Sequence, residues 1–522
     1  FYNTRFWDLT LNAMWRPQGD SALFMVSLLV LTLTAHALLI LLWPTRLLMR
    51  IATSVLFVIA ASSSHFSNEY GAIMNKDMMR NVLQTDVAEA GALMNAETVL
   101  HVAVLGLIPA LLVWKVRLPK IRWKTQLFQR AMFLAIASML CVAGLFASSA
   151  EYATFLRAHK PVRFTLSPAA ASVSMVGVLS AGTTKSANQT LLNPAGASIR
   201  TAEITAKPLV LFLVVGETAR TQNFQLAGYS RPTNPELSQI PNLTFFSKAT
   251  ACGTSTAISV PCLFSHLRRD DFKVDEAGRY ANLLDALSQA GLDVEWRDNN
   301  SGCKGVCARV ASVDYTAAAN PALCTEDNCY DEVMLTDLPA KLQALTRDTV
   351  IVFHMKGSHG PSYFERYPLS FEKFAPACRS NQLQECAPQE IVNVYDNTIA
   401  YTDYVLEKQI RLLREASDRV DGMLMYVSDH GESLGENGIY LHGMPYSFAP
   451  AGQKEVPLLM WMSDGFVART QIQPDCLRAE ANTSVSHDNF YHTALGAAGV
   501  RNQVYNRTLD LISGCRRGHG GE

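Results

Sequence analysis

The sequence contains 522 residues and carries a formal net charge of −1 at neutral pH. This length exceeds one ordinary domain, and the near-zero charge gives no electrostatic attraction to nucleic acid, so we expect no nucleic-acid partner. Hydrophobic residues make up 49% of the chain. They form long apolar blocks in the N-terminal part and are dispersed in the remainder, which has the pattern of a water-soluble globular domain.

Four apolar blocks in the N-terminal part are long enough to cross a bilayer. They cover approximately residues 21–43, 47–66, 97–114 and 131–150. A buried core helix is the alternative for each block, but four such blocks, almost free of charge, favour membrane spans. We therefore predict a bundle of transmembrane helices over residues 1–159.

Basic residues predict the orientation of this bundle. Arg46 and Arg50 flank the turn between the first two spans, and basic residues without an acid separate the third span from the fourth. These are Lys115, Arg117, Lys120, Arg122, Lys124 and Arg130. The positive-inside rule places both connections in the cytoplasm. The loop 67–96 and everything after Glu151 then lie outside, as does Phe1, so we expect one further span upstream.

The outer loop contains Asn81, Thr85 and Glu89 at spacing i, i+4, i+8. A helix through this loop would align the three side chains on one face. A solvated helix face is the simpler interpretation, and a polar wall at which a lipid head group enters a site is the alternative. Residues 160–206 are rich in Ala, Ser, Thr and Pro. We expect them to form a linker with room for one helix along the membrane surface.

After this linker, short apolar runs alternate with amphipathic segments, which is typical of an α/β domain. The predicted strands are Leu209–Val215, Val294–Trp296, Thr349–His354, Gly422–Val427 and Val456–Trp461, and the predicted helices are Asn282–Ala290 and Asn393–Glu415. Continuous apolar runs indicate strands buried on both faces of a parallel sheet. In such sheets, binding and catalytic residues gather at the carboxyl ends of the strands.

Glu217, His359, Asp429 and His430 each follow shortly after a predicted strand. Carboxylates and imidazoles beside a hydroxyl suit zinc, which would lower the pKa of the hydroxyl and neutralise charge on a phosphoryl group. Side chains that could bind phosphate oxygens or protonate a leaving group are Lys304, His359 and His442. We interpret two further histidines as packed residues, namely His487 and His492.

A small-residue loop between Cys252 and Cys262 offers the hydroxyl. A bridge between the two cysteines would hold this loop in a tight ring and present one hydroxyl at a fixed angle. A hydroxyl is a weak nucleophile at neutral pH and needs a base or a metal to activate it. Spacing cannot choose among the candidates, which are Thr254, Ser255, Thr256 and Ser259.

Ten of the eleven cysteines lie after residue 250, and most are closely spaced pairs. Cys141 lies inside an apolar block and is interpreted as a small buried hydrophobe. The even, clustered set predicts disulfides and an oxidising compartment. Structural zinc is the alternative for Cys303–Cys307 and Cys324–Cys329, but so many scattered pairs fit bridges better.

Five stretches resemble the phosphoethanolamine–lipid A transferases, a family that includes enzymes of polymyxin resistance. They are Val215–Arg220, Cys252–Ala257, Trp296–Asn300, Ser358–Pro361 and Ser428–Gly438. The resemblance includes the membrane part and covers nearly the whole chain. It implies the alkaline-phosphatase/sulfatase fold, a sandwich with a mostly parallel central sheet, over residues 207–522. It also implies a bacterial inner-membrane protein with its catalytic domain in the periplasm and a fifth span upstream of Phe1.

The resemblance further implies individual roles. Thr256 would be the nucleophile that becomes modified with phosphoethanolamine. The ligands of one tightly bound Zn²⁺ would be Glu217, Thr256, Asp429 and His430. Positions linked to substrate phosphate or to a second Zn²⁺ are matched by His359 and His442, and further substrate-binding positions by Lys304 and Glu432. Residues that contact the lipid substrate are matched by Asn81, Thr85 and Glu89.

Three cysteine pairs match bridges of the family, namely Cys252–Cys262, Cys324–Cys329 and Cys378–Cys386. The four cysteines that are left over are paired with each other, as Cys303–Cys307 and Cys476–Cys515. We expect a monomeric zinc-dependent transferase that moves phosphoethanolamine from phosphatidylethanolamine to a phosphate of lipid A, through a phosphothreonine intermediate. The added amine would offset phosphate charge and give resistance to cationic peptides.

Alternatives remain open at this point. The acceptor could be a core sugar or a periplasmic glucan, and a lipoteichoic-acid-synthase-like enzyme would move glycerol phosphate instead. A membrane-anchored, metal-dependent hydrolase would use the same metal site without a lipid-facing bundle. A membrane receptor or scaffold would bind without catalysis, and zinc content would separate it from the enzymes.

Overall fold

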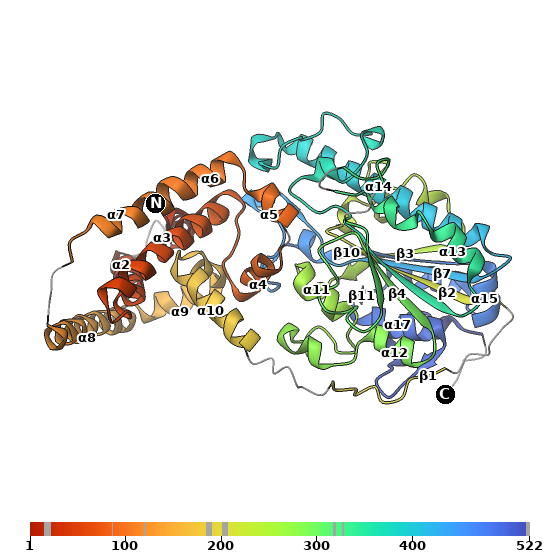
Figure 1. Cartoon of the computed structure of the whole chain (residues 1–522), viewed down its shortest axis with the longest axis horizontal. Helices are drawn as coiled ribbons and strands as arrows, with labels where there is room; N and C mark the ends of the chain where they lie inside the picture. Colours follow the sequence, from red (N-terminus) through yellow and green to blue (C-terminus); the bar gives the residue numbers. More distant parts are fainter. Residues whose placement is uncertain are drawn as a thin grey trace. The chain divides into compact units, whose positions relative to one another are not determined.

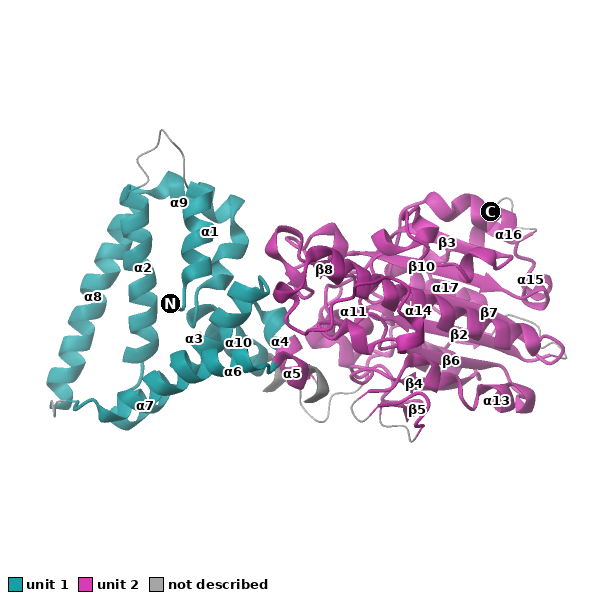
Figure 2. Cartoon of the chain, turned by 90° about the horizontal axis from the view of Figure 1, so that it is seen from above, with its two compact units in different colours: residues 1–80, 94–180 teal, residues 81–93, 181–522 magenta. Residues whose placement is uncertain are grey.

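The computed structural model describes residues 1–14, 22–85, 87–118, 122–183, 191–200, 207–316, 320–325 and 328–517, without the side chains of residues 87–89 and 181–183. Figure 1 colours the chain from the N-terminus to the C-terminus and labels many of its helices and strands. The chain forms two compact units, coloured separately in Figure 2. Unit 1 contains residues 1–80 and 94–180, and unit 2 contains residues 81–93 and 181–522.

Four helical segments of unit 1 are long and apolar enough to cross a membrane, as the sequence predicts. They are α2 (Ala22–Leu41), α3 (Arg46–Glu69), the continuous helix Ala96–Lys115 and α8 (Trp123–Ala147). The other helices of this unit are α1 (Thr4–Met14), most of α4 (Lys76–Gln84), α9 (Ser149–Ala158) and most of α10 (Ala169–Thr183). Only 11–22% of each apolar window is buried within the structure, so most of the apolar surface of these helices is exposed.

The helix Ala96–Lys115 consists of α6 (Ala96–Val102), a π-helical turn (Ala103–Leu107) and α7 (Ile108–Lys115). Pro109 has no N–H to donate to the carbonyl of Leu105, four residues earlier. The hydroxyl of Tyr2 donates to this carbonyl instead, at 2.6 Å. The hydroxyl of Tyr2 thus replaces the hydrogen bond that the carbonyl of Leu105 cannot receive from Pro109.

The segment expected as a linker, residues 160–206, is structured at both ends. A 3-10 segment (Lys160–Thr165) leads into α10, which packs within unit 1 through Ala171 and through a hydrogen bond from Ser174 to the carbonyl of Met74. Strand β1 (Ile199–Arg200) pairs with β12 (Val500–Arg501) in unit 2. Residues 201–206 lie outside the described part.

Unit 2 is built on an eight-stranded sheet with the order β11-β3-β10-β7-β2-β6-β4-β5. The strands are β2 (Leu209–Gly216), β3 (Leu243–Thr250), β4 (Asp293–Asp298), β5 (Ala311–Asp314), β6 (Thr349–His354), β7 (Asp421–Ser428), β10 (Glu455–Met462) and β11 (Val485–Ser486). β10 runs antiparallel to both of its neighbours, and the other neighbouring pairs are parallel. The sheet is therefore mostly parallel, as predicted.

Helices cover both faces of this sheet (Figure 1). Alternate residues of β2 enter different cores because a strand points successive side chains to opposite faces. Leu211 and Leu213 pack with α12 (Leu283–Gln289) and α17 (Asp488–Ala498). Phe212 and Val214 pack with α14 (Pro388–Glu415) and α13 (Leu338–Ala344). Burial on both faces explains the continuous apolar run of β2.

The predicted strands agree with the structure to within one or two residues, but strands β5 and β11 and several shorter helices were not predicted, and further differences are found at β3, at α14 and between α4 and α5. β3 was not predicted, because its side chains alternate between buried and partly exposed positions instead of forming an apolar run. α14 begins at Pro388, five residues before the expected start, since proline is well suited to the first turn of a helix. The helix expected through Asn81, Thr85 and Glu89 is interrupted, because α4 ends at Gln84 and α5 covers Val87–Leu93.

Disulfides join the five cysteine pairs expected from the sequence. They are Cys252–Cys262, Cys303–Cys307, Cys324–Cys329, Cys378–Cys386 and Cys476–Cys515. Cys141 is a free cysteine in α8. All five bridges lie in unit 2, where they close short loops or tie the C-terminal segment to α16 (Pro474–Ala479).

The core between β2 and α14 gives a stability prediction. Phe212 is fully buried and packs edge-to-face on Phe353, with ring centroids 5.0 Å apart. Phe212→Ala should lower the free energy of unfolding by about 3–5 kcal/mol, because it removes buried apolar surface and leaves a cavity. The measurement is the thermal unfolding midpoint of the purified chain. Leu369→Ala is the control, since Leu369 is 71% exposed; equal midpoints for the two variants would contradict the prediction.

Candidate metal centre

The register of the parallel strands brings the candidate ligands to one edge of the sheet. Val215 lies opposite His354 of β6 and Val427 of β7, so these three strands end at the same level. Glu217 follows the end of β2, and Asp429 and His430 follow the end of β7. These three residues therefore lie just beyond the carboxyl ends of parallel strands, as the sequence predicts.

Glu217, Asp429 and His430 form a compact cluster with no exposed side-chain surface. Each offers one ligand atom, and these atoms lie within 4.8 Å of one another. His430 Nε2 lies 3.2 Å from Glu217 Oε1 and 3.4 Å from Asp429 Oδ2. Carboxylates and an imidazole in this arrangement could hold a divalent cation.

A backbone hydrogen bond fixes the orientation of the His430 ring toward the two carboxylates. His430 Nδ1 donates to the carbonyl of Gly431 at 2.9 Å, which leaves Nε2 facing the two carboxylates. Burial alone would lower the pKa of His430, but Asp429 and Glu217 outweigh burial and raise this pKa to about 10. Burial, reinforced by the charge of Glu217, raises the pKa of Asp429 to about 6. The cluster therefore requires positive charge between its carboxylates.

A zinc ion fits this requirement. Asp429 Oδ2 is buried and receives no hydrogen bond in the described part of the chain, so its lone pairs are available to a cation. Two carboxylates balance the charge of a divalent ion while His430 stays neutral. Glu217, Asp429 and His430 are oxygen and nitrogen ligands of the kinds that zinc accepts.

The structure places Thr256 against this cluster. Thr256 Oγ1 lies 3.2 Å and 3.1 Å from the two oxygens of Glu217 and 3.4 Å from His430 Nε2. Thr256 is the first residue of α11 (Thr256–Leu263), a helix that begins inside the loop closed by Cys252–Cys262.

The competing hydroxyls have other environments. Thr254 Oγ1 donates to the carbonyl of Met444 at 2.5 Å, and Ser259 Oγ accepts the N–H of Gly253 at 3.0 Å. Ser255 Oγ is buried and forms no described hydrogen bond. The geometry therefore distinguishes Thr256 from Thr254 and Ser259, which residue spacing did not, and it agrees with the position that the resemblance implies.

His359 and His442 lie beside the cluster. The ring centroid of His442 is 4.3 Å from that of His430 and 5.5 Å from that of His359. His442 Nδ1 lies 3.4 Å from Glu432 Oε2, and the hydroxyl of Tyr363 donates to the same oxygen at 3.0 Å. Burial lowers the pKa of His359 well below its usual range, so this ring is neutral at pH 7.

Other expected site residues are not joined to the cluster by described contacts. Lys304 Nζ donates to the carbonyl and the hydroxyl of Ser301, at 2.8 Å each. Thr85 Oγ1 donates to the carbonyl of Asn81 at 2.9 Å. Residues 81–93, expected in the transmembrane domain, belong to unit 2, where Asn381 donates to the carbonyl of Ala92. The side chain of Glu89 lies outside the described residues.

Two residues that hold the cluster were missing from the sequence-based set. Asn300 Nδ2 donates to Glu217 Oε2 at 2.7 Å, and Thr218 Oγ1 donates to Glu217 Oε1 at 2.7 Å. Thr218 also has a positive φ of 60°, an uncommon conformation for a β-branched residue. Both could have been identified as candidate site residues from the sequence, because Asn300 follows β4 and Thr218 follows β2.

His487 and His492 are packed residues, as predicted. His487 Nδ1 accepts the N–H of Cys252 at 3.1 Å, and its Nε2 donates to the carbonyl of Ser428 at 2.9 Å. It thereby links the loop of Thr256 to the end of β7. His492 Nδ1 accepts the N–H of Asn506.

The burial of His487 predicts a pH dependence of stability. Burial lowers the pKa of His487 to about 4, whereas an unfolded histidine titrates near pH 6.5. The unfolded chain therefore binds this proton first as the pH falls from about 6.5 to 4, and folding loses up to about 3 kcal/mol. His487→Gln, which cannot titrate, should show a smaller decrease of the unfolding midpoint between pH 7.5 and pH 4.5. Both proteins are treated with a chelator before the measurement. An equal decrease of their unfolding midpoints with pH would contradict the low pKa of His487.

Two family models match the chain. The model described as phosphoethanolamine transferase EptA/EptB matches residues 31–182. The model described as sulfatase matches residues 210–500, which contain the sheet and the metal cluster.

Relatives with established names cover nearly all of the chain. Phosphoethanolamine transferase EptA of Escherichia coli (strain K12) is 39% identical over 506 residues, which cover 95% of this chain and 89% of that protein. Phosphatidylethanolamine transferase Mcr-1 of Escherichia coli is 38% identical over 490 residues, covering 92% of this chain and 89% of that protein.

A solved structure gives the same result for the fold. The integral membrane protein lipooligosaccharide phosphoethanolamine transferase A (EptA) from Neisseria meningitidis superposes with a TM-score of 0.94 at 34% identity. The match covers 99% of this chain and 96% of that chain. The chain therefore belongs to the phosphoethanolamine transferase family that includes EptA and Mcr-1, with a catalytic unit of the sulfatase fold.

Proposed function

We propose that this protein transfers phosphoethanolamine from phosphatidylethanolamine to a phosphate of lipid A, with zinc and through a phosphothreonine at Thr256. The observation that carries the proposal is the position of Thr256 Oγ1, within 3.4 Å of both Glu217 and His430. The names of the relatives support the transferred group, because EptA and Mcr-1 are phosphoethanolamine and phosphatidylethanolamine transferases.

The reaction proceeds in two displacements. The hydroxyl of Thr256 loses its proton to solvent, Oγ1 attacks the phosphorus of phosphatidylethanolamine, and the bond from phosphorus to the diacylglycerol oxygen breaks. An oxygen of a lipid A phosphate then attacks the phosphorus on Thr256, the bond from phosphorus to Oγ1 breaks, and Oγ1 takes up a proton from solvent to restore the hydroxyl. A zinc ion bound by Glu217, Asp429 and His430 would lower the pKa of the hydroxyl and offset the charge of the phosphoryl group.

The neighbouring side chains have separate tasks in this scheme. Glu217 accepts the hydrogen bond of Thr256 and orients its oxygen. His442, held by Glu432, delivers a proton to the departing diacylglycerol oxygen. His359 is neutral and can offer one N–H to a phosphoryl oxygen. Lys304 supplies a positive charge for substrate phosphate, with the position of its amine set by Ser301.

The proposed location is a bacterial inner membrane, crossed several times, with unit 2 in the periplasm. Four membrane-length helices and the basic residues between them support this orientation. The five disulfides, all in unit 2, support an oxidising compartment for that unit. Phosphatidylethanolamine and lipid A are then within reach of one protein, which we propose acts as a monomer.

Mass spectrometry of lipid A tests the function. Cells that express the protein should contain lipid A heavier by one phosphoethanolamine group and should resist polymyxin, because the added amine offsets phosphate charge. Thr256→Ala should abolish the shift, since no hydroxyl remains to attack. Thr256→Ser is the matched control and should retain detectable transfer. Modified lipid A from the Thr256→Ala protein would exclude the phosphothreonine, and unchanged lipid A with modified core sugars or glucans would exclude the proposed acceptor.

Metal removal tests the zinc assignment. Purified protein treated with a chelator should lose transfer from phosphatidylethanolamine on the order of 10²-fold, because the hydroxyl and the developing phosphoryl charge lose their electrostatic stabilisation. Zinc should restore the activity of the wild type but not that of Asp429→Asn, which lacks one charged ligand. Full activity in metal-free protein would sink the assignment.

A further inference from the structure

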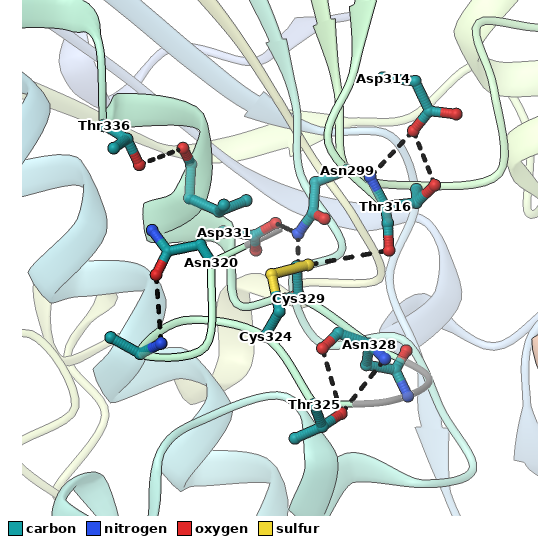
Figure 3. The surroundings of a disulfide bond; sticks show 12 residues. Asn299, Asp314, Thr316, Asn320, Cys324, Thr325, Asn328, Cys329, Asp331 and Thr336 are labelled. Carbon is teal, nitrogen blue, oxygen red and sulfur yellow. Dashed lines mark hydrogen bonds between the residues drawn. A yellow bond between two sulfur atoms is a disulfide. The ribbon is translucent and has the colours of Figure 1, made fainter. Parts of the chain in front are cut away.

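A second buried carboxylate, Asp331, lies near the metal cluster without belonging to it. Asp331 is 4% exposed and begins the 3-10 segment Asp331–Leu335. Its oxygens accept three hydrogen bonds: from Asn299 Nδ2 at 2.9 Å, from the N–H of Lys356 at 2.7 Å and from the N–H of Gly357 at 2.8 Å. Figure 3 shows Asp331 beside Asn299 and the Cys324–Cys329 disulfide.

The first loop held by Asp331 follows β4. Asn299 Nδ2 donates both to Asp331 and to the carbonyl of Cys329, at 3.0 Å, so the loop is attached to a disulfide-closed segment. The next residue, Asn300, donates from Nδ2 to Glu217 Oε2 at 2.7 Å and to the carbonyl of Met355 at 2.9 Å. Asp331 and the side chain of Glu217 are therefore bonded to adjacent residues of one loop.

The second loop held by Asp331 follows β6. Gly357 has a φ of 52° and lies so close to Glu217 that an added Cβ would be 2.6 Å from the carbonyl oxygen of Glu217. The N–H of Ser358 donates to the same carbonyl at 3.0 Å. His359 follows directly in the sequence. This loop therefore holds the backbone of Glu217 and carries a histidine of the site.

We propose that Asp331 is a positioning residue for the zinc centre. Asp331 holds the side chain of Glu217 by way of the loop after β4, and it holds the backbone of Glu217 by way of the loop after β6. The proposal rests on the zinc-dependent function proposed above. One carboxylate suits this task because it presents acceptors to three N–H donors at once. An asparagine at this position would have one acceptor oxygen and would turn an NH₂ group toward a donor.

The neighbouring acid provides a matched control. Glu332 Oε1 accepts the hydroxyl of Tyr404 at 3.2 Å and pairs with Lys408, on the α14 side. No described contact joins Glu332 to either loop at Glu217. Glu332→Gln changes the same charge as Asp331→Asn, one residue away, without touching the hydrogen bonds that hold the metal ligand.

The test measures zinc affinity and not activity alone. The wild type, Asp331→Asn and Glu332→Gln are purified as full-length chains, and zinc affinity is measured by competition with a coloured chelator. Asp331→Asn should bind zinc about 10–100-fold more weakly, as is usual when a residue that orients a metal ligand is changed. Glu332→Gln should bind zinc as tightly as the wild type. Excess zinc should restore part of the transfer activity of Asp331→Asn.

The outcomes separate positioning from support of the fold. A lower unfolding midpoint of Asp331→Asn with unchanged zinc affinity would overturn the proposal, because Asp331 would then act on the fold alone. If Asp331→Asn does not fold, Asn299→Ser decides, since it removes one link between Asp331 and the loop of Asn300. If Asn299→Ser bound zinc as tightly as the unmodified protein, the proposal for Asp331 would be overturned. If the unmodified protein bound no zinc, the proposed metal centre would be overturned as well.

Discussion

The in-register parallel pairing of β2 with β6 and β7 is the constraint on which the site depends. Because Val215, His354 and Val427 lie side by side, the chain leaves three strands at one edge of the sheet. This register brings Glu217 and the pair Asp429–His430 to the same edge, where their ligand atoms lie within 4.8 Å of one another. A shift of one residue in either pairing would turn these side chains to the other face of the sheet.

The burial of two carboxylates at this edge is costly unless positive charge lies between them. Glu217 and Asp429 have no exposed surface, and His430 is drawn toward protonation by their combined field. A divalent cation would satisfy both carboxylates and would leave His430 neutral as a nitrogen ligand. The same positive charge is what Thr256 needs as a nucleophile, so the charge balance of the folded unit and the proposed chemistry have one physical origin.

The loops around the cluster are held by bonds that do not depend on the metal. The Cys252–Cys262 bridge closes the loop of Thr256, and His487 attaches this loop to the end of β7. Asp331 joins the loops that follow β4 and β6. These loops would otherwise be free to move away from the sheet, because loops have few buried apolar contacts of their own. Disulfides of this kind are typical of proteins in oxidising compartments.

The sequence by itself determined the elements that have a local signal. Apolar runs gave the four membrane-length helices and the central strands β2, β6, β7 and β10, and strand ends gave Glu217 and the pair Asp429–His430. The resemblance named Thr256, but only the tertiary structure placed its hydroxyl at the cluster, showed the break between α4 and α5, brought Asn300 to Glu217, and joined Asp331 to the loops after β4 and β6. Those facts depend on hydrogen bonds and distances between segments far apart in the chain, which composition and periodicity do not encode, whereas a buried strand shows in its own residues.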